Sequence, residues 1–386
     1  MTQHILGVAT SRLDQQGGAF TASEITHQPP VWGEVAQLVA SHGPALSAFL
    51  TPLLARADLR IILTGAGTSA FIGGCLLPSL LQRLGRRVEA IPTTDLVSAP
   101  SHYLQPQAPT LLVSFARSGS SPESVAAVAL ADQLVSQVYH LIITCNADGL
   151  LYQHAQGQAN ALAIVLPDAT HDRGFAMTSS FTSMLLTAAL VFGVIDGVGA
   201  GLAAAQQAAG ELMASGLPLI NALVERRFKR VVYLGSNELK GLAQEAALKL
   251  LELSDGKVVA MHDTPLGFRH GPKTIIDSDT LVVLLMSNDA HARRYDSDLL
   301  RELRADGRAG RVLALTAQDD GVVGEDSLLL AGAARCGDLE LALPYIVFAQ
   351  IYAFLYSLAL DIRPDTPSMS GTVNRVVSGV NIYPFG

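Results

Sequence analysis

Short apolar runs that alternate with helix-length segments constrain the fold of this chain more than any other feature. The runs lack the polar alternation of a half-exposed strand, so they are typical of parallel sheets covered by helices on both faces. Strands are expected at residues 60–64, 88–91, 110–114, 141–144 and 162–166, and again at 230–234, 281–286 and 311–316. Helices are expected at residues 68–84, 121–135, 201–227, 237–253, 290–304 and 339–360. The sequence therefore predicts an α/β protein with two doubly wound parallel-sheet domains of similar size.

The length and the apolar content of the chain agree with this prediction. The chain has 386 residues, more than one ordinary domain needs. Hydrophobic residues make up 49% and charged residues only 16%, a composition that argues against disorder. We expect an N-terminal extension over residues 1–34, a first domain over 35–200 and a second domain over 201–386.

Charge, cysteine content and hydropathy narrow the classes of function. The formal net charge is −8 and no block of Lys or Arg stands out, which argues against a nucleic-acid partner. The three cysteines form no C-x-x-C pair and no leader peptide is apparent, so we expect a cytoplasmic protein. The most apolar stretch, 184–195, is shorter than the roughly 20 residues of a membrane span. It predicts a buried helix, and no contact with a membrane is expected.

The first candidate site is the loop GAGTSA over residues 65–70, which follows a predicted strand and opens a helix. In a doubly wound sheet such a turn lies at the carboxyl end of a strand, where ligands bind. Gly67 lets the backbone approach an anion, and Thr68 and Ser69 add hydroxyl donors at a helix N-terminus. The loop is equally typical of a Gly-rich turn with a Ser or Thr N-cap, so both interpretations stay open.

A second loop, SFARSGSSPES over residues 114–124, also follows a strand and precedes a helix. Ser118, Ser120 and Ser121 surround a glycine, and Arg117 stands beside them; this combination suits a phosphomonoester. A capping box with Ser120 or Ser121 as the N-cap is the structural alternative, and capping is compatible with phosphate binding. Neither loop is a nucleotide signature, because G-x-G-x-x-G is incomplete and no G-K-[ST] follows a strand.

Four motifs, taken in order, resemble the sugar isomerase (SIS) domain family. They are the GTS turn, the SGSS loop, EAALKLLEL at 245–253 and RHGP at 269–272. The last two are similar to a helix and a K-H-G-P loop of the glucosamine-6-phosphate synthase isomerase module. The resemblance covers residues 35–386 and implies two SIS domains.

One subfamily fits best. Three segments look like those of the galactosamine-6-phosphate deaminase/isomerase subfamily. They are FARSGSSPES, MTSSFTSM at 177–184 and SGTVNRVVSGV at 370–380. Members of this subfamily have also been described as tagatose-6-phosphate ketose/aldose isomerases.

The resemblance implies roles for three residues. Glu252 stands at the family position of the base that moves a proton between C1 and C2. Lys249 matches an active-site lysine, for which we expect charge stabilisation near O1 or the phosphate rather than a Schiff base. His270 matches a ring-opening histidine that the family takes from a neighbouring subunit, which implies a homodimer with a shared site. Isomerisation through an enediol or enamine needs no cofactor and no metal, and we expect neither.

The helix motif has a structural alternative. Glu245, Lys249 and Glu252 share one helix face, a pattern typical of a surface ion-pair ladder. The residues between them are apolar, however, which favours charges that point into a cleft. The chain also departs from the synthase module, because Ala116 replaces a serine and no lysine follows Lys273.

These observations lead to one main hypothesis and three alternatives. We expect deaminating isomerisation of galactosamine 6-phosphate to tagatose 6-phosphate and ammonia. An isomerase of tagatose 6-phosphate without deamination and a glucosamine-6-phosphate deaminase would use the same residues. A non-catalytic sensor of sugar phosphates is the third alternative, but residues 1–34 are too short for a helix-turn-helix module and the charge balance argues against DNA.

Overall fold

The computed structural model describes residues 3–321, 323–377 and 379–386, which form two compact units. The first-sheet unit comprises residues 31–172, 179–197 and 371–386. The second-sheet unit comprises residues 1–30, 173–178 and 198–370. The units therefore differ from the predicted division at the chain ends, since residues 1–30 pack with the second sheet and residues 371–386 with the first.

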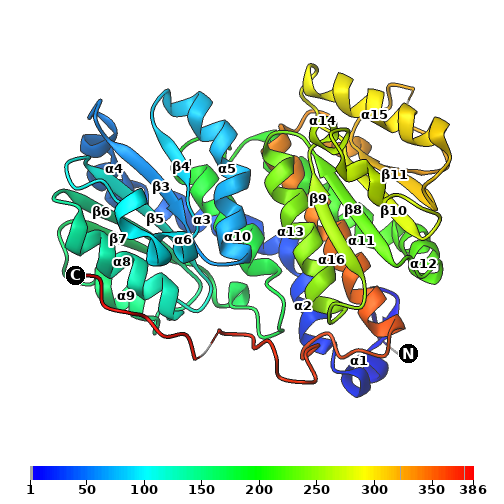
Figure 1. The fold of residues 1–386 in the computed structure, drawn as a ribbon, viewed down its shortest axis with the longest axis horizontal. Helices are drawn as coiled ribbons and strands as arrows, with labels where there is room; N and C mark the ends of the chain where they lie inside the picture. Colours follow the sequence, from blue (N-terminus) through cyan, green and yellow to red (C-terminus); the bar gives the residue numbers. More distant parts are fainter. Residues whose placement is uncertain (1–2, 322, 378) are drawn as a thin grey trace. The chain divides into compact units, whose positions relative to one another are not determined.

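The first-sheet unit is built on a parallel sheet of five strands in the order β4-β3-β5-β6-β7. Its strands are β3 (Arg60–Thr64), β4 (Val88–Ala90), β5 (Thr110–Ala116), β6 (Val138–Thr144) and β7 (Ala161–Val165). Its helices are α3 (Gln28–Ser41, shared with the other unit), α4 (Gly43–Leu54), α5 (Thr68–Leu84), α6 (Thr93–Ser98), α7 (Pro100–Tyr103), α8 (Pro122–Leu134), α9 (Leu150–Ala155) and α10 (Ser179–Val191). The helices lie on both faces of the sheet (Figure 1).

The second-sheet unit repeats this plan with strand order β9-β8-β10-β11-β12. Its strands are β8 (Arg230–Gly235), β9 (Val259–Asp263), β10 (Thr280–Leu285), β11 (Arg311–Thr316) and β12 (Ser327–Leu329). Its longer helices are α1 (Thr10–Gln16), α2 (Ala19–Thr26), α11 (Ala200–Ser215), α12 (Leu217–Glu225), α13 (Glu238–Leu253), α15 (Ala292–Asp306) and α16 (Asp338–Ala359). A short hairpin of β1 (His4–Ile5) and β2 (Val8–Ala9) and the one-turn α14 (Pro265–Phe268) complete it.

The two sheets have the same strand order, and every pairing within them is parallel. All residues of β3, β5 and β10 are buried, as expected for strands without polar alternation. The predicted fold class, two doubly wound parallel sheets, is confirmed.

Three details of the prediction are wrong. The helix predicted over 201–227 is broken at Gly216, where Pro218 lacks an N–H and starts the separate helix α12. Strand β9 was missed because its edge sequence VAMHD mixes apolar and polar residues and none of them is fully buried. Strand β12 was missed because it has only three residues.

Two apolar helices fill the cores of the units. The buried helix predicted over 184–195 is confirmed over residues 184–191, which belong to α10; the helix ends at Val191, and Ser179–Ala189 are all buried. Among the described helices, α16 alone is long and apolar enough to cross a membrane, with a mean hydropathy of 1.6 over its most apolar window. That window is 100% buried inside the protein, which identifies α16 as a core helix.

Candidate active site

The first predicted phosphate loop joins β3 to α5 through a turn that depends on two glycines. A side chain at Gly65 would lie 2.8 Å from the main-chain oxygen of Ser69, so the turn closes only around glycine. Gly67 has φ +54° and ψ −127°, a conformation that ordinary side chains rarely adopt. Gly67 is exposed, whereas Thr68 and Ser69 are buried in the first turn of α5. The turn thus brings exposed backbone to the start of a helix, as an anion site requires.

The second predicted loop lies at the same edge of the sheet. Thr64 at the end of β3 pairs with Ser114 in β5, so the two loops leave neighbouring parallel strands at their carboxyl ends. Ser121 occupies the N-cap position of α8 but makes no capping hydrogen bond, because its hydroxyl donates to Ser124 Oγ at 2.7 Å. The capping-box alternative is therefore wrong. Ser120 Oγ accepts the main-chain N–H of Leu150 at 3.1 Å, which fixes the position of that hydroxyl.

Two arginines place positive charge beside this loop. Arg117 is buried, and its Nη2 donates to the main-chain oxygen of Arg375 at 2.6 Å. Burial lowers the pKa of the neighbouring His171, and the Arg375 and Arg117 guanidinium groups lower it further. The two guanidinium groups thus place positive charge beside the loop, whereas the carboxylates of Asp172 and Asp168 partly offset their effect on His171. The sequence analysis included Arg117, but not Arg375, among the candidate phosphate-binding residues.

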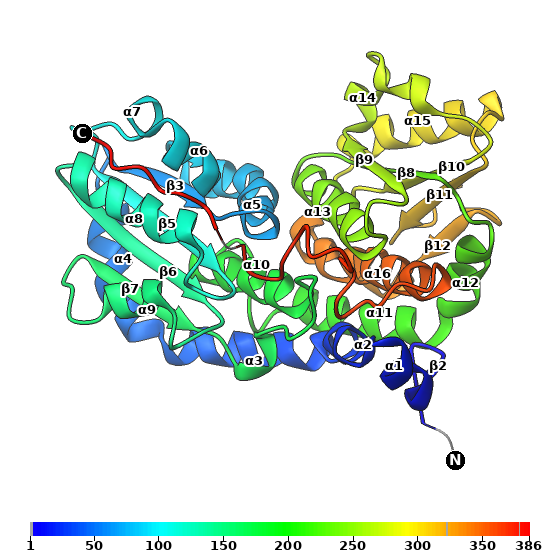
Figure 2. The same ribbon diagram turned by 60° about the horizontal axis from the view of Figure 1, so that its bottom comes forward.

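The C-terminal tail is part of this site's surroundings. It runs beside α8 in the first-sheet unit (Figure 2), where Gln133 Nε2 donates to the main-chain oxygen of Phe385 at 2.8 Å. Arg375 also donates to the main-chain oxygen of Asp172, and the Asp172 carboxylate accepts the Ser179 hydroxyl at 2.6 Å. The structure therefore brings together the MTSSFTSM and SGTVNRVVSGV motifs, which are far apart in the sequence.

The predicted catalytic helix is α13 in the second-sheet unit. Good helix formers such as Ala, Leu, Glu and Lys fill its second half. Glu245 and Lys249 are completely buried, and the Glu252 side chain is 24% exposed. Lys249 Nζ lies 2.6 Å from Glu252 Oε2 and 3.3 Å from Glu245 Oε1. The surface-ladder alternative is wrong, because an ammonium without solvent exposure must be compensated by nearby charge.

The charge state of Lys249 follows from this geometry. Burial alone lowers the pKa of the Lys249 ammonium, but the carboxylates of Glu245 and Glu252 more than offset that effect and raise it above its ordinary value. Lys249 is therefore a permanent cation near neutral pH. It holds the partly exposed Glu252 carboxylate in place, and that carboxylate is the group on this face of α13 that a ligand can reach.

The predicted histidine lies in a loop after β9 and α14. His270 is exposed, and its side chain makes no hydrogen bond with any described residue. The next residue, Gly271, has φ +120°, so the turn requires glycine here. Within the described part of the chain no hydrogen bond or ion pair joins His270 to Glu252.

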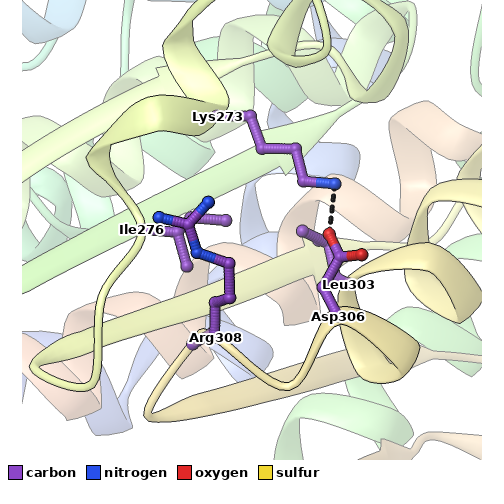
Figure 3. A pocket seen from close by; sticks show the side chains of 6 residues that line it. Lys273, Ile276, Leu303, Asp306 and Arg308 are labelled. Atoms are coloured by element: carbon purple, nitrogen blue, oxygen red, sulfur yellow. Dashed lines mark ion pairs between the residues drawn. The ribbon is translucent and has the colours of Figure 1, made fainter.

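Ion pairs with α15 hold the His270 loop. Arg269 Nη2 lies 2.9 Å from Glu302 Oε2, and Lys273 pairs with both Glu302 and Asp306. Figure 3 shows the Lys273 ammonium directed at the Asp306 carboxylate. The hollow in this view has a volume of about 10 Å³, enough for a single water molecule but not for a sugar. The sequence analysis did not predict these ion pairs because Glu302 lies far from the loop in the sequence.

The described residues thus define the class of the protein: two doubly wound units, one with glycine- and serine-rich loops suited to an anion, the other with a buried Lys–Glu pair on a helix. The SIS domain model matches residues 53–193 and 226–359, and the chain belongs to the SIS domain family. Each match covers one of the two five-stranded sheets.

Relatives of known name match this chain over nearly its whole length. The chain is 48% identical to a D-galactosamine-6-phosphate deaminase, AgaS, of Escherichia coli, over 95% of this chain and 96% of the relative. It is 46% identical to the protein of the same name from Shewanella sp. strain ANA-3, over 98% of this chain and 95% of the relative. A crystal structure of the tagatose-6-phosphate ketose/aldose isomerase from Escherichia coli superposes with a TM-score of 0.86 at 44% identity, covering 95% of this chain and 97% of that chain.

Proposed function

We propose that this protein converts galactosamine 6-phosphate into tagatose 6-phosphate and ammonia. The single observation that carries the proposal is the buried Lys249 ammonium, which holds the partly exposed Glu252 carboxylate at 2.6 Å. The names of the Escherichia coli and Shewanella relatives supply the substrate. The two glycine- and serine-rich loops suit its phosphate group.

The reaction would begin with binding and ring opening. Gly67, Thr68 and Ser69 would offer backbone N–H groups and hydroxyls to the phosphate, together with Ser118, Ser120 and Ser121 of the second loop. His270 would then move a proton between O5 and O1 as the pyranose opens, since a neutral imidazole can accept one proton and return another.

Glu252 would perform the central proton transfer. Its carboxylate removes the C2 proton of the open-chain amino aldose and delivers it to C1, while O1 gains a proton and the amine loses one, which leaves a C1 hydroxyl and an imine at C2. Water adds to C2 and ammonia leaves, so the products are the ketose phosphate and ammonia. The Lys249 ammonium, which is buried behind Glu252, would stabilise the negative charge that develops at O1 through its electrostatic field rather than by contact. A Schiff base through Lys249 is disfavoured because its raised pKa leaves no lone pair on the amine near neutral pH.

The first experiment is ammonia release from purified protein given galactosamine 6-phosphate and, in parallel, glucosamine 6-phosphate. Ammonia from the galacto sugar alone is the expected result. Release from the gluco sugar alone would keep the mechanism and move the specificity to the other C4 epimer.

The second candidate is an aldose–ketose isomerase of tagatose 6-phosphate, and the name of the Escherichia coli structure favours it. Both candidates need Glu252 and His270, so only the products separate a hydrolase from an intramolecular oxidoreductase. Conversion of tagatose 6-phosphate to an aldose, with no ammonia from either amino sugar, would overturn the deaminase proposal.

We also propose that the enzyme acts in the cytoplasm as a homodimer whose partner supplies His270. The exposure of His270 and the absence of a hydrogen bond or ion pair to Glu252 within the described residues support a role in the partner's site. Mixing inactive Glu252→Gln and His270→Asn proteins tests this. Partial recovery of activity after subunit exchange is expected, whereas a mixture that stays inactive while exchanging subunits would contradict a shared site.

A further inference from the structure

Two histidines and one aspartate meet on the first-sheet unit, away from the candidate active site. Asp132 comes from the last turn of α8, His140 from β6 and His154 from the last turn of α9. Asp132 Oδ1 lies 2.9 Å from His140 Nε2, and Asp132 Oδ2 lies 3.3 Å from His154 Nε2. One potential ligand atom from each residue lies within 4.8 Å of the other two.

We infer that this cluster, Asp132–His140–His154, binds a divalent transition-metal ion of the zinc class. Two imidazole nitrogens and one carboxylate oxygen are a common ligand set for such ions. Around a tetrahedral ion with bonds of about 2.0–2.1 Å, ligand atoms are separated by roughly 3.3 Å. The two measured nitrogen–oxygen separations, 2.9 and 3.3 Å, are close to this value, although they involve different oxygens of Asp132. All three ligand atoms lie within 4.8 Å of one another, so side-chain rotation would bring them onto one ion.

Burial and electrostatics both favour a cation here. His140 is completely buried, and its Nε2 points at the carboxylate, so one ligand is held rigidly by the sheet. The other two are solvent-accessible, at 36% exposure for Asp132 and 32% for His154, so an ion can enter without unfolding. Asp132 and His154 also lie in the last turns of their helices, where the main-chain carbonyl groups carry negative partial charge. Figures 1 and 2 agree in placing α8 and α9 beside β6.

The ion has a structural role, not a catalytic one. His140 is the third residue of β6, near the amino end of the strand. The candidate phosphate loops leave β3 and β5 at their carboxyl ends, which is the opposite edge of the same parallel sheet. A metal at this cluster would tie the ends of α8 and α9 to β6 and leave the proposed reaction metal-free.

The sequence analysis expected no metal because isomerisation through an enediol or enamine needs none, an argument that does not bear on a structural ion. The three residues of this cluster come from separate elements, with spacings that match no helical metal motif. A carboxylate that bridges two imidazoles by hydrogen bonds alone would look similar, and the experiment must separate the two.

The test is titration of chelator-treated full-length protein with Zn²⁺ by calorimetry and with Co²⁺ by visible absorption. We expect about one equivalent of tightly bound ion, a tetrahedral Co²⁺ spectrum and a higher Tm with Zn²⁺. Binding should weaken as the pH falls, because protons compete for the imidazole nitrogens.

Variants locate the site. His154→Gln and Asp132→Asn should weaken binding by roughly 10–100-fold or more and abolish the Tm increase, without disturbing the core. His102→Gln, an exposed histidine of α7 in the same unit, is the matched control and should bind like the wild type. Absence of stoichiometric binding, or binding that survives both variants, would overturn the proposal and leave a hydrogen-bonded triad.

Discussion

The two units use the same turn after β3 and β8, but we propose an anion site only at the turn after β3. Gly65 and Gly67 in the first-sheet unit correspond to Gly235 and Asn237 in the second. Gly67 has φ +54° and ψ −127°, and Asn237 has φ +50° and ψ −119°. A side chain at Gly235 would meet the main-chain oxygen of Leu239 at 2.3 Å, the same kind of conflict as at Gly65. The two units therefore share the backbone conformation of this turn, although their sequences differ there.

The next loop shows where the units diverge. After β5, the first-sheet unit has SGSS, whereas after β10 the second has Ser287 followed by NDAH. There the carboxylate of Asp296 accepts Ser236 Oγ at 2.7 Å and the main-chain N–H of Ser287 at 2.9 Å. The Asp338 carboxylate accepts the main-chain N–H of Asn288 at 2.7 Å. The protein's own carboxylates thus occupy the donors that an external anion would need.

This difference suggests a division of labour. Under the proposed function, the first-sheet unit would use its loop donors for a phosphate group, and the second-sheet unit, whose equivalent donors are bound by its own carboxylates, would carry the reacting groups on α13. A carboxylate inside the second pair of loops repels a phosphate, which explains why one anion site is expected from two similar sheets.

The largest effect on activity is expected from replacing Glu252. Glu252→Gln removes the proposed base and should lower kcat by about 10²–10⁴-fold with little change in KM, because substrate binding rests on the first-sheet loops. Ammonia release gives both constants. Glu225→Gln, an exposed carboxylate at the end of α12, is the control and should behave like the wild type. A variant at Glu252 that raises KM and spares kcat would contradict the division of labour.

A comparable effect on stability is expected at Lys249. Lys249→Met leaves the buried Glu245 carboxylate without its cation and should lower the free energy of unfolding by about 3–5 kcal/mol in urea denaturation. The double variant with Glu245→Gln should recover part of this loss. Lys257→Met, at an exposed position just after α13, is the control. Equal stability of Lys249→Met and the wild type would show that the pair is not compensating a buried charge.

The sequence was sufficient for the regular parts of this architecture and insufficient for its long-range contacts. Uninterrupted apolar runs and flanking glycines located the strand at 60–64 and the helix at 68–84, because both signals are local. The i, i+3 and i, i+4 spacing placed Glu245, Lys249 and Glu252 on one face. It could not decide whether that face is buried, since burial of Lys249 depends on packing of α13 against distant segments such as α16.

The role of the Asp296 carboxylate in the second-sheet loops can be tested through the pH dependence of stability. Burial raises the pKa of Asp296 to about 6, an effect that the bonds from Ser236 and Ser287 reduce and the Asp338 charge increases. A folded-state pKa above the unfolded value means that the stabilisation is complete below about pH 4 and lost as the pH rises through 6. The free energy of unfolding of the wild type relative to Asp296→Asn should therefore fall by about 2–3 kcal/mol between pH 4 and 7.

Urea denaturation of both proteins across this pH range provides the measurement. Asp298→Asn changes an exposed carboxylate of the same helix and should leave the pH profile parallel to that of the wild type. If the pH profile of Asp296→Asn were also parallel to that of the wild type, ionisation of the Asp296 carboxyl group would not destabilise the folded protein.

The smallest effect is expected from a substitution that makes the loops of the two units more alike. The position of Ser120 in the first-sheet unit corresponds to that of Ala290 in the second-sheet unit, so Ser120→Ala gives both loops the same residue there. The Ser120 hydroxyl accepts from Leu150, so its own hydrogen remains to be donated to a phosphate oxygen. Losing one hydrogen bond to a charged group should raise KM about tenfold, with kcat nearly unchanged. Ser98→Ala, an exposed serine of α6, is the control, and a Ser120→Ala enzyme with unchanged KM would remove this hydroxyl from the site.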